Sequence, residues 1–184
     1  MDNNYIFQYW EAIQNGTVTV GKWIKTIYEI LVNGLKSGKW DFDEEKANKA
    51  INFIENFCHH SEGRNDLLKL ELWQKAIVSA IFGIMDKRTG YRQFREVFIV
   101  VARKNGKTLF AAAIAAYMAY IDGEYGAKVY FLAPKLDQAD LVYDAFYQIV
   151  QADDELDSIT KKRRSDIYIK EFNTSVKKIA FNSK

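Results

Sequence analysis

The residues best suited to chemistry in this chain form one short segment at positions 103–108. In order, they are Arg103, Lys104, Asn105, Gly106, Lys107 and Thr108. A glycine followed by a lysine and a hydroxyl residue is typical of a phosphate-binding loop, in which backbone N–H groups and the positive end of a helix dipole face an anion. In such a loop Lys107 would reach the β- and γ-phosphates of a nucleotide, and the Thr108 hydroxyl would ligate Mg²⁺. The segment therefore predicts a phosphate site, and a plain basic turn is the alternative.

The stretches on either side of this segment support the phosphate interpretation. Residues 96–102 form a near-continuous run of β-branched and aromatic residues, which is typical of a strand buried on both faces of a parallel sheet. Residues 109–120 are rich in alanine and contain neither Gly nor Pro, which favours a helix. One position departs from the full G-x-x-x-x-G-K-[ST] pattern, because Val101 stands where its first glycine is expected.

The first part of the chain reads as helical. Clustered apolar residues predict helices over residues 5–13 and 20–35. Asp43 is suited to cap a third helix, whose apolar residues recur at helical spacing and which should end near His60. A further apolar stripe predicts a helix over residues 70–85.

The second part of the chain has a different periodicity. A strand at 96–102, a helix at 108–120, a strand at 128–133 and a helix at 137–150 follow one another in βαβα order, which predicts a parallel sheet covered by helices. Residues 166–181 alternate apolar and polar positions around a central turn, and we expect them to form a hairpin toward a sheet edge. We therefore expect a helical region at residues 1–66 and an α/β core at 67–184.

Composition excludes a disordered chain and carries no strong global charge signal. Hydrophobic residues make up 48% of the 184 residues, enough to bury a core. The net charge of +2 is too small to indicate nucleic acid by itself, so a contact with DNA must come from a local patch. The clearest patch consists of Lys161, Lys162, Arg163 and Arg164. It is either a solvated loop or a surface that contacts phosphates.

Cysteine usage and the start of the chain predict a soluble, cytoplasmic protein. Cys58 is the only cysteine, so an intrachain disulfide is impossible and a reducing compartment is the simpler assumption. The first residues lack the features of a signal peptide, and no apolar run approaches the ~20 residues of a membrane span. Cys58, His59 and His60 suggest zinc, but no second ligand cluster exists in the sequence, so a polar helix end is favoured.

The order of these features resembles the large subunit of tailed-phage DNA-packaging terminases. Residues 103–108 are similar to the deviant P-loop of that family, and Trp73 and Gln74 resemble its Trp-Gln motif on the adenine side of the nucleotide. Residues 133–139 resemble the segment after its second core strand. The resemblance covers essentially the whole chain, with specific motifs within residues 70–140. It implies a RecA-like P-loop NTPase core that binds ATP and Mg²⁺.

The resemblance also implies roles for individual residues. Lys107 and Thr108 would hold the triphosphate and Mg²⁺, and Gly106 would let the backbone approach the phosphates. Arg103 matches the P-loop arginine that is proposed to stabilise transition-state charge in this family, and an arginine finger from a neighbouring subunit is the competing source of that charge. Lys104 and Asn105 complete the phosphate loop.

The Trp-Gln pair has two interpretations. Gln74 offers both a donor and an acceptor, which could pair with the adenine edge. Alternatively, Trp73 is a core anchor and Gln74 a surface residue.

A P-loop ATPase also needs carboxylates at the end of a hydrophobic strand. Asp153, Asp154 and Glu155 are the obvious candidates, but they follow a predicted helix, so a solvated helix end is the stronger interpretation. In terminases the acidic strand comes after a hairpin like the one at residues 166–181, and a nuclease domain follows. The chain therefore resembles the N-terminal part of the motor, without the hydrolytic carboxylates and the nuclease domain.

As a whole, the resemblance implies a motor that couples ATP hydrolysis to translocation of double-stranded DNA into a procapsid. Its partners would be DNA, the portal protein and the small terminase subunit, and it would act as a homo-oligomeric ring. It would work in the cytoplasm of an infected or lysogenic bacterial host, with no membrane contact, and would be absent from the mature virion. Two alternatives stay open: a non-hydrolysing nucleotide- or protein-binding module, and another P-loop ATPase of helicase type.

Overall fold

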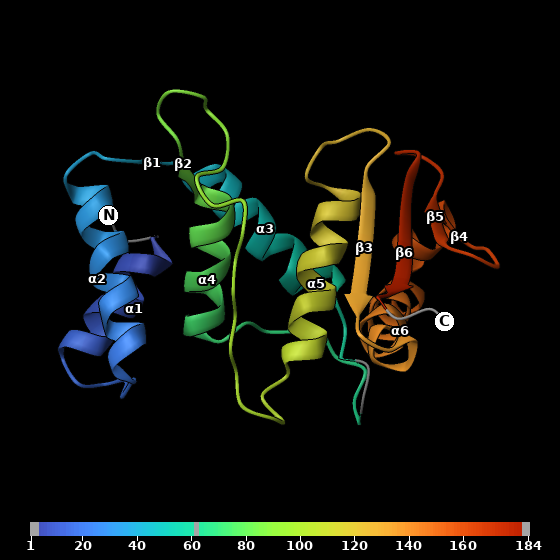
Figure 1. Cartoon of the computed structure of the whole chain (residues 1–184), viewed down its shortest axis with the longest axis horizontal. Helices are drawn as coiled ribbons and strands as arrows, with labels where there is room; N and C mark the ends of the chain where they lie inside the picture. Colours follow the sequence, from blue (N-terminus) through green and yellow to red (C-terminus); the bar gives the residue numbers. More distant parts are fainter. Residues whose placement is uncertain (1–3, 61–62, 182–184) are drawn as a thin grey trace. The chain divides into compact units, whose positions relative to one another are not determined.

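The structure is a computed structural model that describes residues 4–60 and 63–181 (Figure 1). Its contacts divide the chain into two compact units. Residues 1–52 and 70–99 form the first, called unit 1 below, and residues 53–69 and 100–184 form unit 2. Each unit is therefore built from two separate stretches of sequence. The single boundary between residues 66 and 67 stays a prediction about domain organisation.

Unit 1 is mostly helical, as its apolar periodicity predicts. It contains α1 (Tyr5–Gln14), α2 (Lys22–Lys36), α4 (Leu72–Gly83) and most of α3 (Glu44–Phe57). The side chain of Asp43 accepts a hydrogen bond from the backbone N–H of Lys46 at 2.9 Å, which confirms its role at the start of α3. That helix ends three residues before the predicted His60. The helical region also includes a short strand, so it is not purely helical.

The core of unit 1 is an aromatic and aliphatic cluster between α1, α2 and α4. The rings of Tyr9 and Tyr28 meet edge to face with their centroids 4.7 Å apart. The Trp40 ring lies so close to the backbone of Gly34 that a Cβ at this position would collide with it, so a glycine is required there. The buried members of this cluster are Ile6, Tyr9, Tyr28, Leu31, Val32, Trp40, Ala76 and Ile84.

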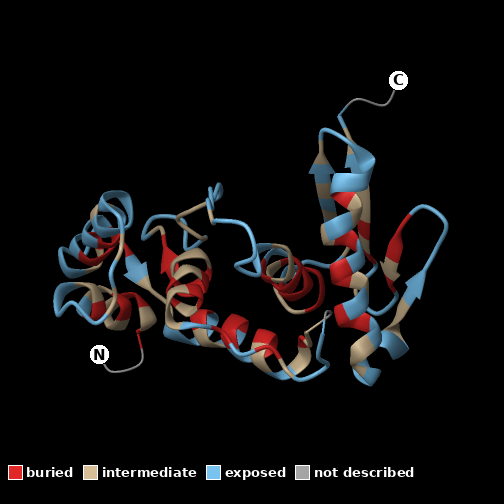
Figure 2. Ribbon diagram, turned by 90° about the horizontal axis from the view of Figure 1, so that it is seen from below, coloured by how far each residue is buried: buried red, intermediate tan, exposed pale blue. Residues whose placement is uncertain are grey.

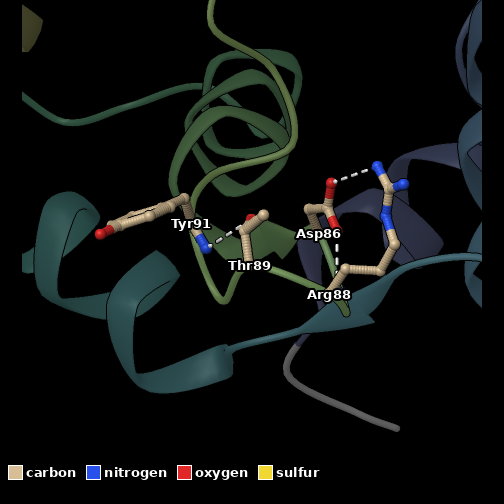
Figure 3. Close-up of polar contacts among 4 residues, drawn as sticks. All are labelled: Asp86, Arg88, Thr89 and Tyr91. Atoms are coloured by element: carbon tan, nitrogen blue, oxygen red, sulfur yellow. Dashed lines mark hydrogen bonds and ion pairs between the residues drawn. The ribbon is translucent and has the colours of Figure 1, made fainter.

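Unit 1 also contains a short antiparallel pair of strands. Strand β1 (Asp41–Phe42) pairs with β2 (Ile84–Met85), which takes the last two residues of the helix predicted over 70–85. The chain then turns through residues 86–91, where Asp86 accepts hydrogen bonds from the backbone N–H of Arg88 at 2.8 Å and from its guanidinium at 3.4 Å (Figure 3). The hydrogen bond from the Arg88 backbone N–H lowers the pKa of the Asp86 carboxyl, and the bond from the Arg88 guanidinium lowers it further.

Unit 2 is an α/β layer with a mixed sheet. Its strands are β3 (Lys128–Ala133), β4 (Thr160–Lys162), β5 (Ile167–Ile169) and β6 (Thr174–Ala180), and its helices beyond residue 100 are α5 (Lys107–Tyr120), α6 (Leu136–Ala152) and α7 (Asp154–Ile159). The strand order is β3-β6-β5-β4, and only β3 and β6 run parallel, side by side in Figure 1. The sheet is therefore mixed and not parallel throughout, because β4, β5 and β6 follow one another through short turns that reverse the chain.

The predicted hairpin is confirmed, with one change of position. Strands β5 and β6 pair antiparallel, with Ile169 opposite Thr174. However, β6 lies inside the sheet between β3 and β5, while β4 occupies the edge. Helix α6 covers both β3 and β6, and the Phe146 side chain at its centre is fully buried.

The predicted strand at residues 96–102 is wrong. This stretch has no regular secondary structure, and Phe98 and Val100 are 92% and 78% exposed. A strand is defined by pairing with a neighbouring strand. Within the described residues, no strand pairs with residues 96–102. Their β-favouring composition is therefore not enough to make them a strand.

Candidate phosphate-binding site

The predicted phosphate loop is a tight turn that leads directly into α5. Gly106 is the N-cap residue and has a left-handed backbone with φ 65° and ψ 16°, a conformation that favours glycine. Lys104 also has a positive φ of 67°. The side-chain amide of Asn105 donates to the carbonyl oxygens of Ala102 and Arg103, both at 3.3 Å. Asn105 therefore holds the turn in shape from within.

The start of α5 presents backbone donors and positive charge. The first bond into the helix runs from the backbone N–H of Phe110 to the carbonyl of Gly106 at 2.9 Å. The N–H groups before it have no carbonyl one turn earlier to accept them. No side chain caps this helix, and its first turn carries no acidic residue.

The side chains of the loop add positive charge to the N-terminus of α5. Arg103, Lys104 and Lys107 are exposed, and Thr108 is half-buried on the first turn of α5. The structure thus brings the six predicted loop residues together at one helix N-terminus, where dipole and side-chain charge have the same sign. Such an arrangement can bind an anion of high charge.

Gln74 has a local structural role that sequence reasoning missed. Its side-chain oxygen accepts from the backbone N–H of Glu71 at 2.9 Å, and the Glu71 side chain caps the N–H of Gln74 in return. This is a capping box, and the three-residue spacing of Glu71 and Gln74 was the available signal. Gln74 is only 8% exposed, so the alternative that placed it on the surface was wrong.

Trp73 packs half-buried against the core of unit 1, as the core-anchor interpretation expects. Trp73 and Gln74 belong to unit 1, whereas the loop at residues 103–108 belongs to unit 2. Their contact with adenine stays a prediction.

The acidic triplet after α6 forms a helix start. Asp153 accepts hydrogen bonds from the backbone N–H groups of Glu155 and Leu156, both at 3.0 Å, and so caps α7. Asp154 and Glu155 are exposed in its first turn. Asp153 also directly follows the last residue of α6, so the interpretation as a helix end is confirmed for Asp153, whereas Asp154 and Glu155 begin a helix that was not predicted.

The basic run lies on strand β4 and the turn after it, not in a free loop. Lys161 and Lys162 belong to the edge strand β4, and all four cations of residues 161–164 are exposed. The Lys162 ammonium lies 4.0 Å from the ring centre of Tyr147, and the Arg163 guanidinium lies 3.6 Å from that of Tyr168. These aromatic partners come from α6 and β5, so the sequence alone offered no signal for them.

The Cys58 thiol, just after α3, is buried in unit 2. Burial, with a smaller contribution from Asp153, raises its pKa to about 12. Over residues 4–60 and 63–181, no three or more His, Cys, Asp or Glu side chains gather so that they could hold a metal ion. In the same part of the chain, no helix is long and apolar enough to cross a membrane.

Comparison with known proteins decides the family. Residues 72–183 match the family described as terminase large subunit, ATPase domain. The chain belongs to this family. The matched range of the terminase ATPase domain includes Trp73, Gln74, the loop at residues 103–108 and all the strands of unit 2.

A solved terminase has a similar fold. The crystal structure of the HK97 bacteriophage large terminase aligns with a TM-score of 0.65 and 24% sequence identity, over 76% of this chain and 28% of that one. The chain thus spans less than a third of that terminase. Among curated proteins, none matches significantly.

Proposed function

We propose that this chain is the ATP-binding part of a terminase large subunit and that residues 103–108 bind the triphosphate with Mg²⁺. The observation that carries the proposal is the uncapped N-terminus of α5, which follows a left-handed Gly106 and is surrounded by Arg103, Lys104 and Lys107. The family match includes this loop. In this role Lys107 contacts the β- and γ-phosphates, Thr108 ligates Mg²⁺, and Gly106 lets the backbone approach the phosphates.

Arg103 is the proposed source of positive charge for the transition state, with an arginine from a neighbouring subunit as the alternative. Trp73 and Gln74 are the proposed adenine-side residues. The Gln74 oxygen accepts from the backbone N–H of Glu71, and its NH₂ group is the proposed donor to a base.

The binding proposal is tested by calorimetry with Mg²⁺-ADP. We expect Lys107→Ala to weaken binding at least tenfold, since it removes a charge-assisted contact to phosphate, which corresponds to about 1.5–3 kcal/mol. Lys170→Ala is the matched control, because Lys170 is an exposed lysine of unit 2 beyond the loop. Equal affinity for the wild type and Lys107→Ala would remove the phosphate assignment.

We also propose that the parent protein is the motor that moves double-stranded DNA into a procapsid, as a homo-oligomeric ring with the portal protein and the small terminase subunit, in the host cytoplasm. The feature that favours a DNA contact is the exposed row of four cations at residues 161–164. Lys162 and Arg163 lie against the rings of Tyr147 and Tyr168, and these contacts limit the freedom of both cations before binding.

The DNA contact is tested by the salt dependence of binding. We expect weak binding of any duplex, with a Kd of ~10⁻⁴ to 10⁻⁶ M at physiological salt, and a steep loss as salt rises because each neutralised phosphate releases counterions. Substitution of the four basic residues by serine should flatten this slope. An unchanged slope in a fluorescence titration at two salt concentrations would leave the row as a solvated surface.

A non-hydrolysing binding module is the second candidate. The observation that favours it is the local use of Asp153, whose Oδ1 accepts from two backbone N–H groups at the start of α7 and so has a structural role there.

A further inference from the structure

Asn105 lies between two residues whose backbone is left-handed. The φ angles of Lys104 and Gly106 are 67° and 65°. Glycine adopts this conformation without a steric penalty, whereas a lysine is seldom found in it. Among the described residues, the other non-glycine residue with a positive φ is Asn173, and asparagine tolerates this conformation better than most residues do. The turn at Lys104 is therefore strained, and surrounding contacts must hold it in shape.

The side chain of Asn105 supplies contacts of this kind. Its amide nitrogen donates hydrogen bonds to the carbonyl oxygens of Ala102 and Arg103, both at 3.3 Å. Bonds from an asparagine side chain to nearby backbone groups are a common way of stabilising a turn. Both bonds span Lys104, so they oppose rotation of its backbone away from the left-handed conformation.

These two bonds also fix the direction of backbone N–H groups. A trans peptide group is planar, so its N–H points away from its own C=O. The carbonyl of Ala102 shares a peptide group with the N–H of Arg103, and the carbonyl of Arg103 shares one with the N–H of Lys104. Because both carbonyls are directed at the Asn105 amide, the two N–H groups are directed to the opposite side. Successive backbone N–H groups held in this way form a concave site for anions.

We propose that Asn105 is a positioning residue for phosphate: its amide holds the turn at Lys104 and thereby aims the backbone N–H groups of Arg103 and Lys104 at the bound anion. This role rests on the proposed function of residues 103–108. It differs from the role of Lys107, because Asn105 carries no charge and acts through the backbone instead of through contact with the nucleotide.

The first test is calorimetry of Mg²⁺-ADP binding to variants at position 105. Asn105→Asp keeps the size of the side chain but replaces the donor by a carboxylate, so we expect binding about tenfold weaker than in the wild type. Asn105→Ala removes the amide and should weaken binding several-fold. Asn105→Ser restores a donor and should recover part of that loss. Residues 102–107 are exposed, in the pale blue of Figure 2, so these variants disturb no core.

Asn33→Asp is the matched control for the change of charge, because Asn33 is exposed on α2 in unit 1. It should bind Mg²⁺-ADP as the wild type does. If Lys107→Ala loses binding while Asn105→Ala and Asn105→Asp keep wild-type affinity, the positioning role is overturned and the phosphate assignment stands. An affinity of Asn105→Ser no better than that of Asn105→Ala would also overturn the role. Absence of binding by the wild type would remove the phosphate assignment itself, and this role with it.

The second test asks whether Asn105 holds the strained turn, and it uses urea unfolding without nucleotide. Lys104→Gly and Lys104→Ala remove the same charge, but only glycine accepts a positive φ without strain. We therefore expect Lys104→Gly to unfold at a higher urea concentration than Lys104→Ala. In the Asn105→Ala background this difference should shrink, because the turn is then free to relax. An equal difference in both backgrounds would show that Asn105 does not hold Lys104.

Discussion

The phosphate loop at residues 103–108 and the apolar run at 96–102 are adjacent in the sequence, yet only the loop has the structure that its residues predict. The loop forms the helix start that its residues predict, whereas the apolar run does not form its predicted strand. The loop and α5 are specified by interactions between residues a few positions apart, such as the bond from Phe110 to Gly106. A strand depends on a neighbour distant in sequence. The difference teaches that, in this chain, a pattern satisfied by hydrogen bonds between near neighbours predicts structure more reliably than β-propensity, which also needs a distant partner strand.

A pair of phenylalanine substitutions tests this difference with the largest expected effect. Phe110 is 3% exposed on α5, so Phe110→Ala should lower the free energy of unfolding by about 3–5 kcal/mol. Phe98→Ala should change it by less than about 0.5 kcal/mol, because Phe98 is exposed in an unpaired segment. Urea unfolding of both variants measures the contrast. A comparable loss in Phe98→Ala would show that residues 96–102 are paired in solution.

The helix cap at Asp153 provides a test of intermediate size. Asp153→Ala should lower the free energy of unfolding by about 0.5–2 kcal/mol, since two backbone N–H groups of α7 lose their acceptor. Asp153→Asn keeps an acceptor oxygen and should lose less. Because we assign no carboxylate of this chain the role of orienting water, Mg²⁺-ATP hydrolysis by this chain should be near background before and after either change. Turnover that disappears in Asp153→Asn would instead make this residue catalytic.

The turn at Asp86 provides the smallest expected effect. Its carboxyl has a lowered pKa, so the charged form is favoured by folding. The resulting stability is present above the pKa of an unfolded aspartate and is lost as pH falls through the lower folded pKa. Asp86→Asn should therefore lower the stability slightly at neutral pH, and its difference from the wild type should disappear as pH falls through this acidic range. A pH series of thermal unfolding measures it, and identical profiles would contradict a charge effect.

Much of the secondary structure could be predicted from local patterns. Strand β3 coincides with its predicted range, and α5 and α6 begin one residue earlier than expected. The candidate phosphate loop and the interpretation of Asp153 as part of a helix end followed from the same kind of pattern. The role of Gln74 was not predicted, although the three-residue spacing of Glu71 and Gln74 is a local signal for a capping box.

By itself, the sequence determined which stretches form most of the helices and which residues meet at the start of α5, because hydrogen bonds within a helix and its caps join residues three or four positions apart. Only the tertiary structure decided the mixed sheet, the interior place of β6 and the contacts of the basic row with the rings of Tyr147 and Tyr168. These features join segments far apart along the chain. Pairing between such segments depends on which partners reach one another, and no residue pattern within one segment carries that information.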